Sequence, residues 1–386
     1  MPSRRFSGRL PADLRPNALA SERHELGDVP FDLTLSNPTR CGIPYPDDLL
    51  RPLADPAGLA YEARPLGLDV ARRAVAAEYG RTGRSIDPAR VVITASTSEA
   101  YSILFKLLCD PGDAVLVPAP SYPLFEHLAA LEAVRAVPYR LDPGRGWQPQ
   151  VPRAAFDSAR ALIVVHPNNP TGTCVAPPVA AELLERCARS GAALIADEVF
   201  LDYPSGGRPV PHLPEAGGAL SFTLGGLSKS VGLPQLKLGW IVAAGPARHV
   251  DEALERLAFV ADSYLSVATP VQHALADLLA RGSAVRAAIL ERCRANLATL
   301  RAVLANAAGI EWTPPDGGWS VVLRCAGVAD EEELALELLG EDGVAVHPGY
   351  LFDFAEPGYL ALSLLPAPAV FAEGIRRLAQ RVASRL

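Results

Sequence analysis

The chain has 386 residues, 49% of them hydrophobic and 20% charged, which is enough for a large buried core and about two to three domains. A formal net charge of -7 and the lack of any basic run argue against a nucleic-acid partner. No apolar stretch approaches the ~20 residues that cross a membrane, and no apolar signal-peptide core follows the first arginines, so no membrane partner is expected. The six cysteines are scattered without metal-binding spacing, which favours a reducing, cytoplasmic location and no metal site.

Short apolar runs alternate with helix-like segments between about residues 90 and 245. These runs cover residues 91–94, 114–117, 161–165, 193–196, 222–224 and 239–243. Because they are apolar on both faces and separated by helical patterns, they predict a buried, mostly parallel sheet of βαβ units. Chemistry in such a sheet is found beyond the carboxyl ends of its strands.

The C-terminal part of the sequence predicts different elements. Residues 283–308 are typical of one long amphipathic helix, and residues 318–324 and 359–364 read as strands on either side of a helix near 330–340. We therefore expect a large α/β domain over residues 46–282. A smaller α+β domain is expected from residues 1–45 together with residues 283–386.

Lysine is rare in this chain, with only Lys106, Lys229 and Lys237 among 36 basic residues. A guanidinium stays protonated, whereas a lysine amine can lose its proton, attack a carbonyl and form a Schiff base. Lys106 lies in the apolar segment Leu104–Leu108 and is interpreted as a leftover lysine without a chemical role. Lys229 lies in a Gly/Ser-rich stretch directly after an apolar run, and it is the candidate nucleophile.

Two polar groups follow predicted strands at the carboxyl edge. Asp197 ends the run 193–196, where a carboxylate can pair with a buried cation such as a protonated pyridine nitrogen, or can cap a loop. Asn169 precedes Pro170 in an Asn-Pro-Thr-Gly segment, where it offers an amide donor or forms a simple turn.

Two further segments could hold other parts of a phosphorylated aromatic cofactor. Ser96, Thr97 and Ser98 lie where a strand leads into a helix, which suits a phosphate cup and equally suits a plain helix cap. Tyr122 follows a proline turn after the next strand and could stack on a flat ring or pack in the core. Together with a lysine, a carboxylate and an amide, these groups form a complete holding set for pyridoxal phosphate.

With these motifs the sequence resembles the fold-type I pyridoxal-phosphate enzymes, specifically the class I/II (aspartate aminotransferase-like) aminotransferases. The resemblance begins at Leu35–Pro38, continues through Leu59–Tyr61 and Leu68–Arg72, and reaches Val346–Gly349. It implies a three-layer αβα large domain with a mostly parallel sheet. It also implies a homodimer in which Tyr61 reaches the phosphate in the partner's site.

The resemblance assigns a role to each motif residue. Lys229 would hold the cofactor as a Schiff base and later move the substrate's α-proton, while Asp197 would keep the pyridine nitrogen protonated. Asn169 would bond the phenolic oxygen of the cofactor and Tyr122 would stack on its ring. The phosphate would be bound by residues from two segments of the chain, namely Ser96, Thr97 and Ser98 in one and Lys237 in the other.

The chain departs from the family pattern around the cofactor. The usual Asp-x-x-Tyr reads Asp197-Glu-Val-Phe200, which removes a hydroxyl from the cofactor's phenolic oxygen. The expected serine three residues before the lysine is Gly226. The expected arginine eight residues after it is Lys237, which keeps a charge but loses the bidentate fork.

A fourth departure concerns the substrate. The family binds the substrate α-carboxylate with an arginine in an Arg-x-Ser stretch, and this chain reads Ala361-Leu-Ser363. Either Arg40 or Arg324 replaces that arginine, or the substrate presents no free α-carboxylate.

The function expected from this resemblance is transfer of an amino group from an amino acid or amine to a keto acid or carbonyl acceptor. A pyridoxal-phosphate lyase, decarboxylase or cyclase is the alternative on the same fold. A cofactor-binding regulator is disfavoured because no helix-turn-helix region is appended. A dinucleotide oxidoreductase is disfavoured because no G-x-G-x-x-G run opens a helix after a strand.

Overall fold

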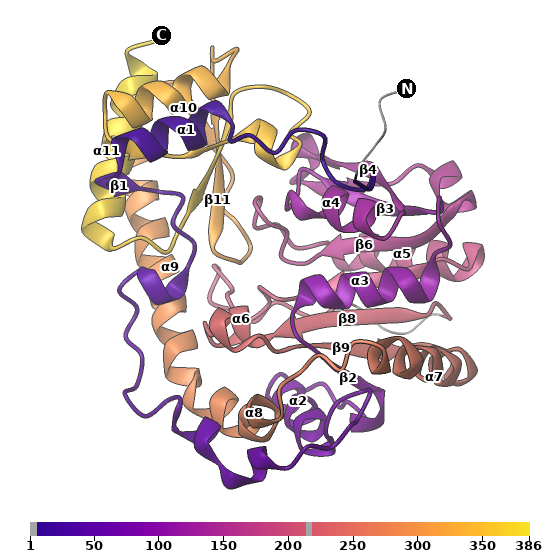
Figure 1. Ribbon diagram of the computed structural model, residues 1–386. Helices are drawn as coiled ribbons and strands as arrows, with labels where there is room; N and C mark the ends of the chain where they lie inside the picture. The colour runs from indigo at the N-terminus through magenta and orange to yellow at the C-terminus, as the bar shows by residue number, and fades with distance from the viewer. Residues whose placement is uncertain (1–5, 214–217) are drawn as a thin grey trace.

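A computed structural model describes residues 6–213 and 218–386 of the chain, and a large sheet forms the right-hand part of the molecule in the view of Figure 1. This sheet has eight strands in the order β2-β9-β8-β7-β6-β3-β4-β5. In that order the strands are β2 (Val91–Thr94), β9 (Gly239–Ala244), β8 (Ser221–Gly226), β7 (Ala193–Asp197), β6 (Ala159–Val165), β3 (Ala114–Ala119), β4 (Arg135–Asp142) and β5 (Gln148–Gln150).

The strand directions bring most carboxyl ends to one edge of this sheet. Strands β4, β3, β6, β7 and β8 are parallel to one another, whereas β9 is antiparallel to both of its neighbours, β8 and β2. Two reversals restore the direction, so β2 runs parallel to β8 and its carboxyl end lies at the same edge. The amino end of β9 also reaches that edge. The sheet is therefore mostly parallel, as expected.

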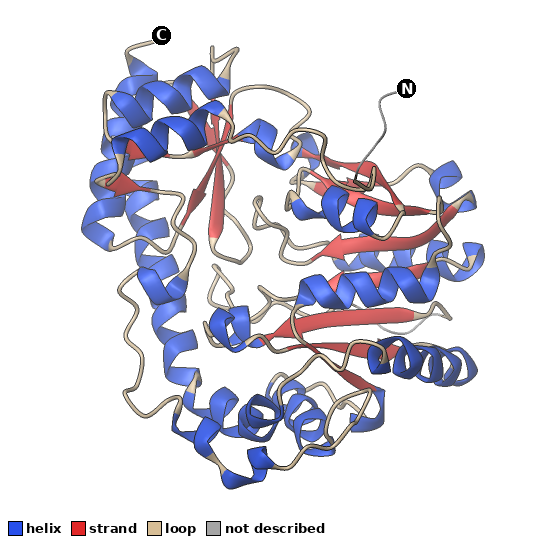
Figure 2. Ribbon diagram, in the orientation of Figure 1, coloured by secondary structure: helices blue, strands red, loops and turns tan. Residues whose placement is uncertain are grey.

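Helices cover both faces of the large sheet (Figure 2), because its strands are apolar on both sides. Ile163 and Val165 pack in the cluster with α3, α4 and α7, whereas Leu162 and Val164 pack with α5 on the opposite face. Helices α2 and α8 cover the end formed by β2 and β9. The bounds are α2 (Asp69–Arg81), α3 (Thr97–Leu108), α4 (Leu124–Leu131), α5 (Pro177–Ser190), α6 (Leu227–Ser230), α7 (Ala247–Asp262) and α8 (Thr269–Arg281). The three-layer αβα arrangement is confirmed.

Strands β4 and β5 are the part of the large sheet that the apolar runs did not predict. Strand β4 has three exposed residues, Pro138 among them, and β5 has only three residues, none of them buried. Strand β5 is the edge strand and β4 lies next to it, so the buried core of the sheet ends there and polar residues are tolerated. The few apolar residues that alternate in such a segment are too weak a signal to predict a strand.

A second, smaller sheet has the strand order β10-β11-β14-β13. The long helix α9 connects the two parts of the molecule, and α1 packs beside α10 near the small sheet (Figure 1). The N-terminal segment joins this part because β1 pairs in parallel with β12. The bounds are α1 (Ala18–Leu26), β1 (Phe31–Asp32), α9 (Ser283–Leu304), β10 (Ile310–Trp312), β11 (Ser320–Cys325), α10 (Glu331–Gly340), β12 (Val344–Ala345), β13 (His347–Pro348), β14 (Tyr359–Ser363) and α11 (Pro368–Ala383). The domain boundaries near residues 46 and 283 stay a prediction.

Candidate active site

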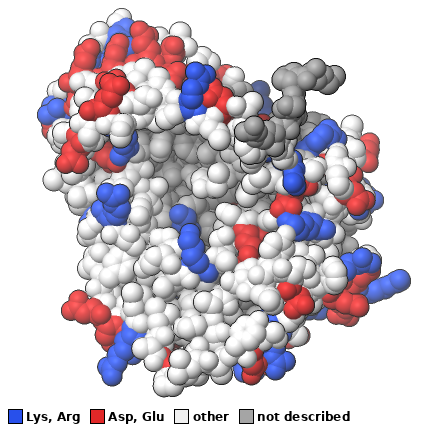
Figure 3. All heavy atoms as spheres, in the orientation of Figure 1, with Lys and Arg blue, Asp and Glu red and all other residues white. Residues whose placement is uncertain are grey.

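A cavity of about 420 Å³ lies where the carboxyl edge of the large sheet faces the small sheet. Figure 3 shows this face of the molecule hollowed between the two parts, with mostly uncharged side chains around the hollow. The cavity wall includes six of the residues that the sequence singled out: Thr97, Ser98, Tyr122, Asn169, Asp197 and Lys229. Residues from five separate segments of the chain therefore meet at one place.

Asp197 and Lys229 carry the charges of the cavity wall. Asp197 ends β7 and is 8% exposed, and its carboxylate accepts hydrogen bonds from the Tyr101 hydroxyl at 2.8 Å and the Val199 N–H at 3.2 Å. Burial raises the pKa of Asp197, and these two hydrogen bonds and Lys229 act in the opposite direction. The carboxylate is thus held in a fixed direction from two sides.

The amine of Lys229 points among aromatic rings rather than toward an anion. Its Nζ lies 4.8 Å from the ring centroid of Trp319 and 5.4 Å from that of Phe200. Within the described residues it makes no hydrogen bond or ion pair. Burial lowers the pKa of Lys229, opposed by the charge of Asp197. A larger fraction of this amine is therefore unprotonated at a given pH than for an ordinary lysine.

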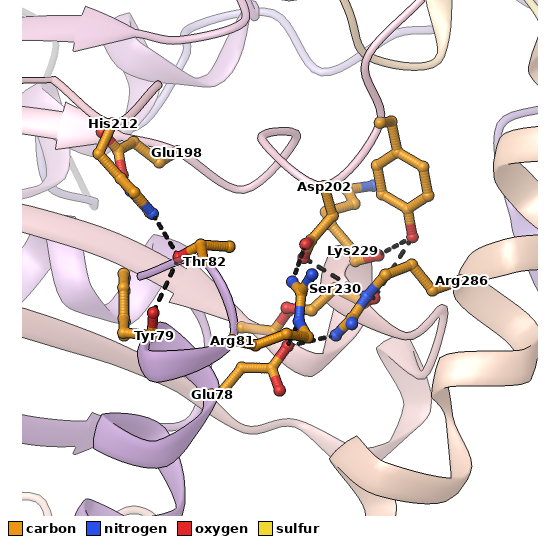
Figure 4. Close-up of polar contacts among 12 residues, drawn as sticks. Glu78, Tyr79, Arg81, Thr82, Glu198, Asp202, His212, Lys229, Ser230 and Arg286 are labelled. Atoms are coloured by element: carbon orange, nitrogen blue, oxygen red, sulfur yellow. Dashed lines mark hydrogen bonds and ion pairs between the residues drawn. The ribbon is translucent and has the colours of Figure 1, made fainter. Parts of the chain in front are cut away.

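A network of buried groups fixes the turn that carries Lys229. Helix α6 is only four residues long, so its last carbonyls have no helical partner. The Tyr203 hydroxyl donates to the Lys229 carbonyl at 2.5 Å, and Arg286 Nε donates to the Ser230 carbonyl at 2.7 Å. Figure 4 shows how Arg286 continues this network into Glu78 and Asp202.

The same cluster is almost neutral in charge. Arg286 lies 2.5 Å from Glu78 and 3.6 Å from Asp202, and Arg81 pairs with both of these carboxylates. The two arginines and two carboxylates offset one another, with the Arg286 side chain 9% exposed and that of Arg81 44% exposed. Removing the carboxylate partners of the buried Arg286 would leave its charge uncompensated, so these pairs help to hold the backbone below Lys229.

The start of α3 has the geometry of an anion site. The Ser96 hydroxyl accepts from the Glu99 N–H at 3.1 Å, and the Glu99 carboxylate accepts from the Ala95 N–H at 2.5 Å, which is a capping pair. No hydrogen bond to the N–H groups of Thr97 or Ser98 is found in the described part of the chain. Free N–H groups at a helix start, beside two hydroxyls in the cavity wall, suit a phosphate.

Two loops next to the cavity are tied to each other through Asn168. Its amide donates to the Pro120 carbonyl at 3.1 Å, and its side-chain oxygen accepts from the Ser121 hydroxyl at 3.0 Å. Tyr122 follows directly on one loop and Asn169 on the other. The ring and the amide are therefore positioned together.

The loop after Asn169 also contacts the small-sheet part of the chain. Gly172 has φ +68°, and a Cβ there would lie 2.3 Å from Pro315 Cβ. Its carbonyl accepts from the N–H groups of Asp316 and Gly317. Only glycine fits this backbone conformation and close approach.

Five of the candidate residues do not line the cavity. The side chain of Ser96 is used in the cap of α3. Lys237 is exposed in the segment before β9, although Gly239 packs against the Ser96 backbone and so brings that segment near the start of α3. Arg40 is exposed, and Tyr61 is 73% exposed in a separate hollow.

Arg324 lies on the same face of β11 as Ser320 and Val322. Ser320 lines the cavity, whereas Arg324 lies farther along the strand, past Val322. It pairs there with Glu356 at 3.5 Å and Glu311 at 3.9 Å. It lines a different hollow. The structure therefore does not bring Arg324 to the predicted substrate position.

Sequence reasoning missed several groups that shape the site. Tyr101 lies one helical turn after Thr97, and that i, i+4 spacing was the available signal that both face the same end of the sheet. His347 lies in the Val346–Gly349 segment, which was recognised only as a resemblance. Tyr203 and Arg286 gave no local signal, because their role depends on contacts distant in the sequence.

Neither a membrane-spanning helix nor a metal-binding cluster is found within the described residues. No helix there is both long and apolar enough to cross a membrane. No group of three or more His, Cys, Asp or Glu side chains in residues 6–213 and 218–386 could hold a metal ion.

Comparison with known proteins places this geometry in a family. The family model described as aminotransferase class I and II matches residues 61–382. An alanine aminotransferase from Mycobacterium bovis is 28% identical over 379 residues, covering 93% of this chain and 86% of that protein. A glutamate-pyruvate aminotransferase from Haemophilus influenzae is 27% identical over 373 residues, covering 92% of this chain and 91% of that protein.

Solved structures agree in fold. An aspartate aminotransferase double mutant from Thermus thermophilus has a TM-score of 0.82 at 26% identity and covers 97% of this chain and 99% of its own. An alanine aminotransferase from Pyrococcus furiosus has a TM-score of 0.84 at 23% identity, with 95% of each chain covered, which supports the fold alone.

Proposed function

The chain belongs to the class I and II aminotransferase family, and from that premise we propose that it uses pyridoxal 5'-phosphate bound in the cavity of Lys229 and Asp197. As an aminotransferase it moves an amino group between an amino acid or amine donor and a keto acid or carbonyl acceptor. The observation that supports the cofactor proposal most strongly is the environment of the Lys229 amine. The amine is partly buried, without an ion-pair partner in the described residues, and shares one cavity with the buried carboxylate of Asp197.

The donor set fits this cofactor. Asp197 would hold the proton on the pyridine nitrogen, since its carboxylate is fixed by Tyr101 and the Val199 N–H. Thr97, Ser98 and the free N–H groups of α3 would bind the phosphate, with Lys237 nearby as a point charge. Asn169 would bind the phenolic oxygen, and the exposed ring of Tyr122 would cover the cofactor's face.

Lys229 is the residue to which the cofactor would attach and the proton carrier of the reaction. When bound, pyridoxal phosphate supplies a carbonyl carbon that takes the amino group and a ring that withdraws electrons from the substrate Cα. The Lys229 Nζ takes the proton from Cα and returns it, which requires an amine that is unprotonated for part of the cycle. Burial lowers its pKa in the required direction. The rings of Phe200 and Trp319 lie beside this amine and would keep water away from that proton transfer.

The assembly and its location are part of the same proposal. Tyr61 is 73% exposed and does not line the cavity of its own chain, which suits a role at the site of a partner subunit in a homodimer. All six cysteines are free, which suits a reducing cytoplasm. We also propose the division into a large domain of residues 46–282 and a small domain of residues 1–45 and 283–386.

A labelled-nitrogen exchange tests this function. The wild-type protein, loaded with pyridoxal phosphate, is incubated with a panel of nitrogen-labelled amino acids and amines and with keto-acid acceptors. We expect label to appear in the acceptor. Lys229→Arg is the matched control, because it keeps a cation but cannot lose its proton, and it should transfer none. Equal transfer by both proteins would refute the role of Lys229.

A further inference from the structure

The wall of the cavity opposite Lys229 is formed by the small sheet. On β14, Ala361 and Ser363 are two residues apart and therefore point to the same face. Ala361 pairs directly with His347 on β13, and Ser363 pairs directly with Ser320 on β11. Directly paired residues share a face, and all four line the cavity. The wall is thus one imidazole, two hydroxyls and a methyl group.

This wall carries no formal positive charge. Among the described residues that line the cavity, the charged side chains are Lys229 and Asp197, which are opposite in sign. Ala361 is 2% exposed and too short to bring any polar atom into the cavity. A free carboxylate placed against this wall would lose its water shell and gain only neutral hydrogen-bond donors. Burying an anion without a cation is unfavourable.

Arg23, which contacts the cavity-lining residue Thr34, is already paired with a carboxylate. Arg23 on α1 donates to the Thr34 hydroxyl at 2.9 Å and to the Asp32 carboxylate at 2.5 Å, and Thr34 lines the cavity. The positive charge of Arg23 is therefore neutralised by its ion pair with Asp32, and Arg23 does not offer a free cation to a ligand. Arg23 and Asp32 together therefore bring no net charge to the cavity, and Thr34 contributes only its hydroxyl oxygen.

His347 is the group on this wall that can recognise a ligand. Its ring packs edge-on against Phe352 at a centroid distance of 5.8 Å, and within the described residues neither ring nitrogen makes a hydrogen bond. Burial lowers the pKa of His347, and Arg23 acts in the same direction against Asp32. A neutral imidazole offers one donor and one acceptor, which matches a hydroxyl or an amide better than a carboxylate.

We propose that His347, with Ser320 and Ser363, binds an uncharged polar group of the amino donor, so that the enzyme prefers amino alcohols and amino amides to free α-amino acids. This inference rests on the proposed function and specifies its substrate class. His347 is the residue that sets the preference, and Ala361 permits it by leaving the wall without a guanidinium.

Matched donors measure this preference directly. Leucine, leucinamide and leucinol share one carbon frame and differ only in the group that would face His347. With the protein loaded with pyridoxal phosphate, we expect kcat/KM for leucinol and leucinamide to exceed that for leucine by about tenfold or more, the equivalent of roughly 1.4 kcal/mol. A kcat/KM for leucine equal to or above the other two would overturn the proposal.

A binding measurement separates this proposal from the proposed function. Isovalerate and isovaleramide lack an amine and cannot react, so calorimetric titration of the loaded protein reads the wall alone. We expect the amide to bind more tightly than the carboxylate. Tighter binding of isovalerate would overturn the proposal even if transamination is confirmed. If no donor is converted, the proposed function fails, and this pair still decides the polarity of the wall.

Variants of the cross-strand pair identify the residues responsible. His347→Leu should raise KM for leucinol with little change in kcat, whereas His347→Gln keeps a donor and an acceptor and should restore KM. Ala361→Arg should shift both the kinetic and the binding preference toward leucine and isovalerate. Ala361→Met introduces a long side chain without a charge, so it should weaken the binding of all these ligands to a similar extent. An unchanged preference in Ala361→Arg would contradict the proposal.

Discussion

The Tyr203 hydroxyl anchors the turn that carries Lys229, and its removal gives the most specific test of that anchor. Tyr203→Phe keeps the ring, which is 1% exposed and packs edge-on against Trp319 at 5.1 Å. It removes the donor to the Lys229 carbonyl, to which no other donor is found in the described residues. Leaving a buried carbonyl unpaired costs about 1–3 kcal/mol, and the Lys229 carbonyl is partly buried, so the lower part of that range applies. We therefore expect the free energy of unfolding to fall by that amount.

Tyr139→Phe is a matched control for this change. Tyr139 is also buried, and its hydroxyl donates to the backbone carbonyl of Ile163 at 2.8 Å, on the strands rather than at the lysine turn. Urea unfolding should show a similar loss in both variants. The rate at which pyridoxal phosphate attaches to the protein, followed by absorbance, should fall only in Tyr203→Phe. Equal attachment rates in the two variants would refute the view that Tyr203 positions Lys229.

Four further predictions follow from the site and its surroundings. Because burial lowers the pKa of Lys229, covalent modification of this amine in the cofactor-free protein should rise with pH around a midpoint below the 10.5 of an ordinary lysine, and a midpoint at or above 10.5 would contradict the burial argument. Asp197→Asn removes the charge that raises this pKa, so the same titration should move to still lower pH, with turnover of the loaded enzyme reduced. Phe200→Tyr should add a donor to the cofactor's phenolic oxygen and lower the pH at which the absorbance of the lysine-bound cofactor changes; an unchanged midpoint in a spectral titration would exclude this contact. Gly172→Ala should destabilise the fold by more than about 1 kcal/mol in urea unfolding, and by more than Gly146→Ala, whose added Cβ meets nothing within 4 Å at a similar φ of +63°.

The buried centre of the sheet could be predicted from sequence because its physical signal is local. Each inner strand is a short apolar run, and the polar residue after it must lie at the carboxyl edge. In the structure Asp197 ends β7, and Asn169 follows β6 at the same edge of the sheet. The position of Lys229 beside them follows from β8 running parallel to β7.

Other features depend on contacts that no local pattern contains. Strands β4 and β5 are held by pairing at the sheet edge, not by their own apolar content. Arg286 reaches the Ser230 carbonyl across 56 positions of sequence, and its chemistry is that of any arginine in an amphipathic helix. His347 becomes a candidate ligand-binding residue only because the register of β13 and β14 places it opposite Ala361.

Arg324 illustrates the same limit for a predicted residue. Its position on β11 was consistent with the substrate site, since alternate residues of that strand share a face with Ser320. The strand carries it past the cavity, however, to Glu356 and Glu311. Which alternate position faces the cavity depends on the packing of the two sheets.

The most direct test of the account is the identity of the lysine that binds the cofactor. The chain has three lysines, Lys106, Lys229 and Lys237, so reductive trapping of pyridoxal phosphate followed by peptide mass mapping gives an unambiguous result. The account predicts attachment at Lys229 alone. Attachment at Lys106 or Lys237 with Lys229 unmodified would contradict the proposed site.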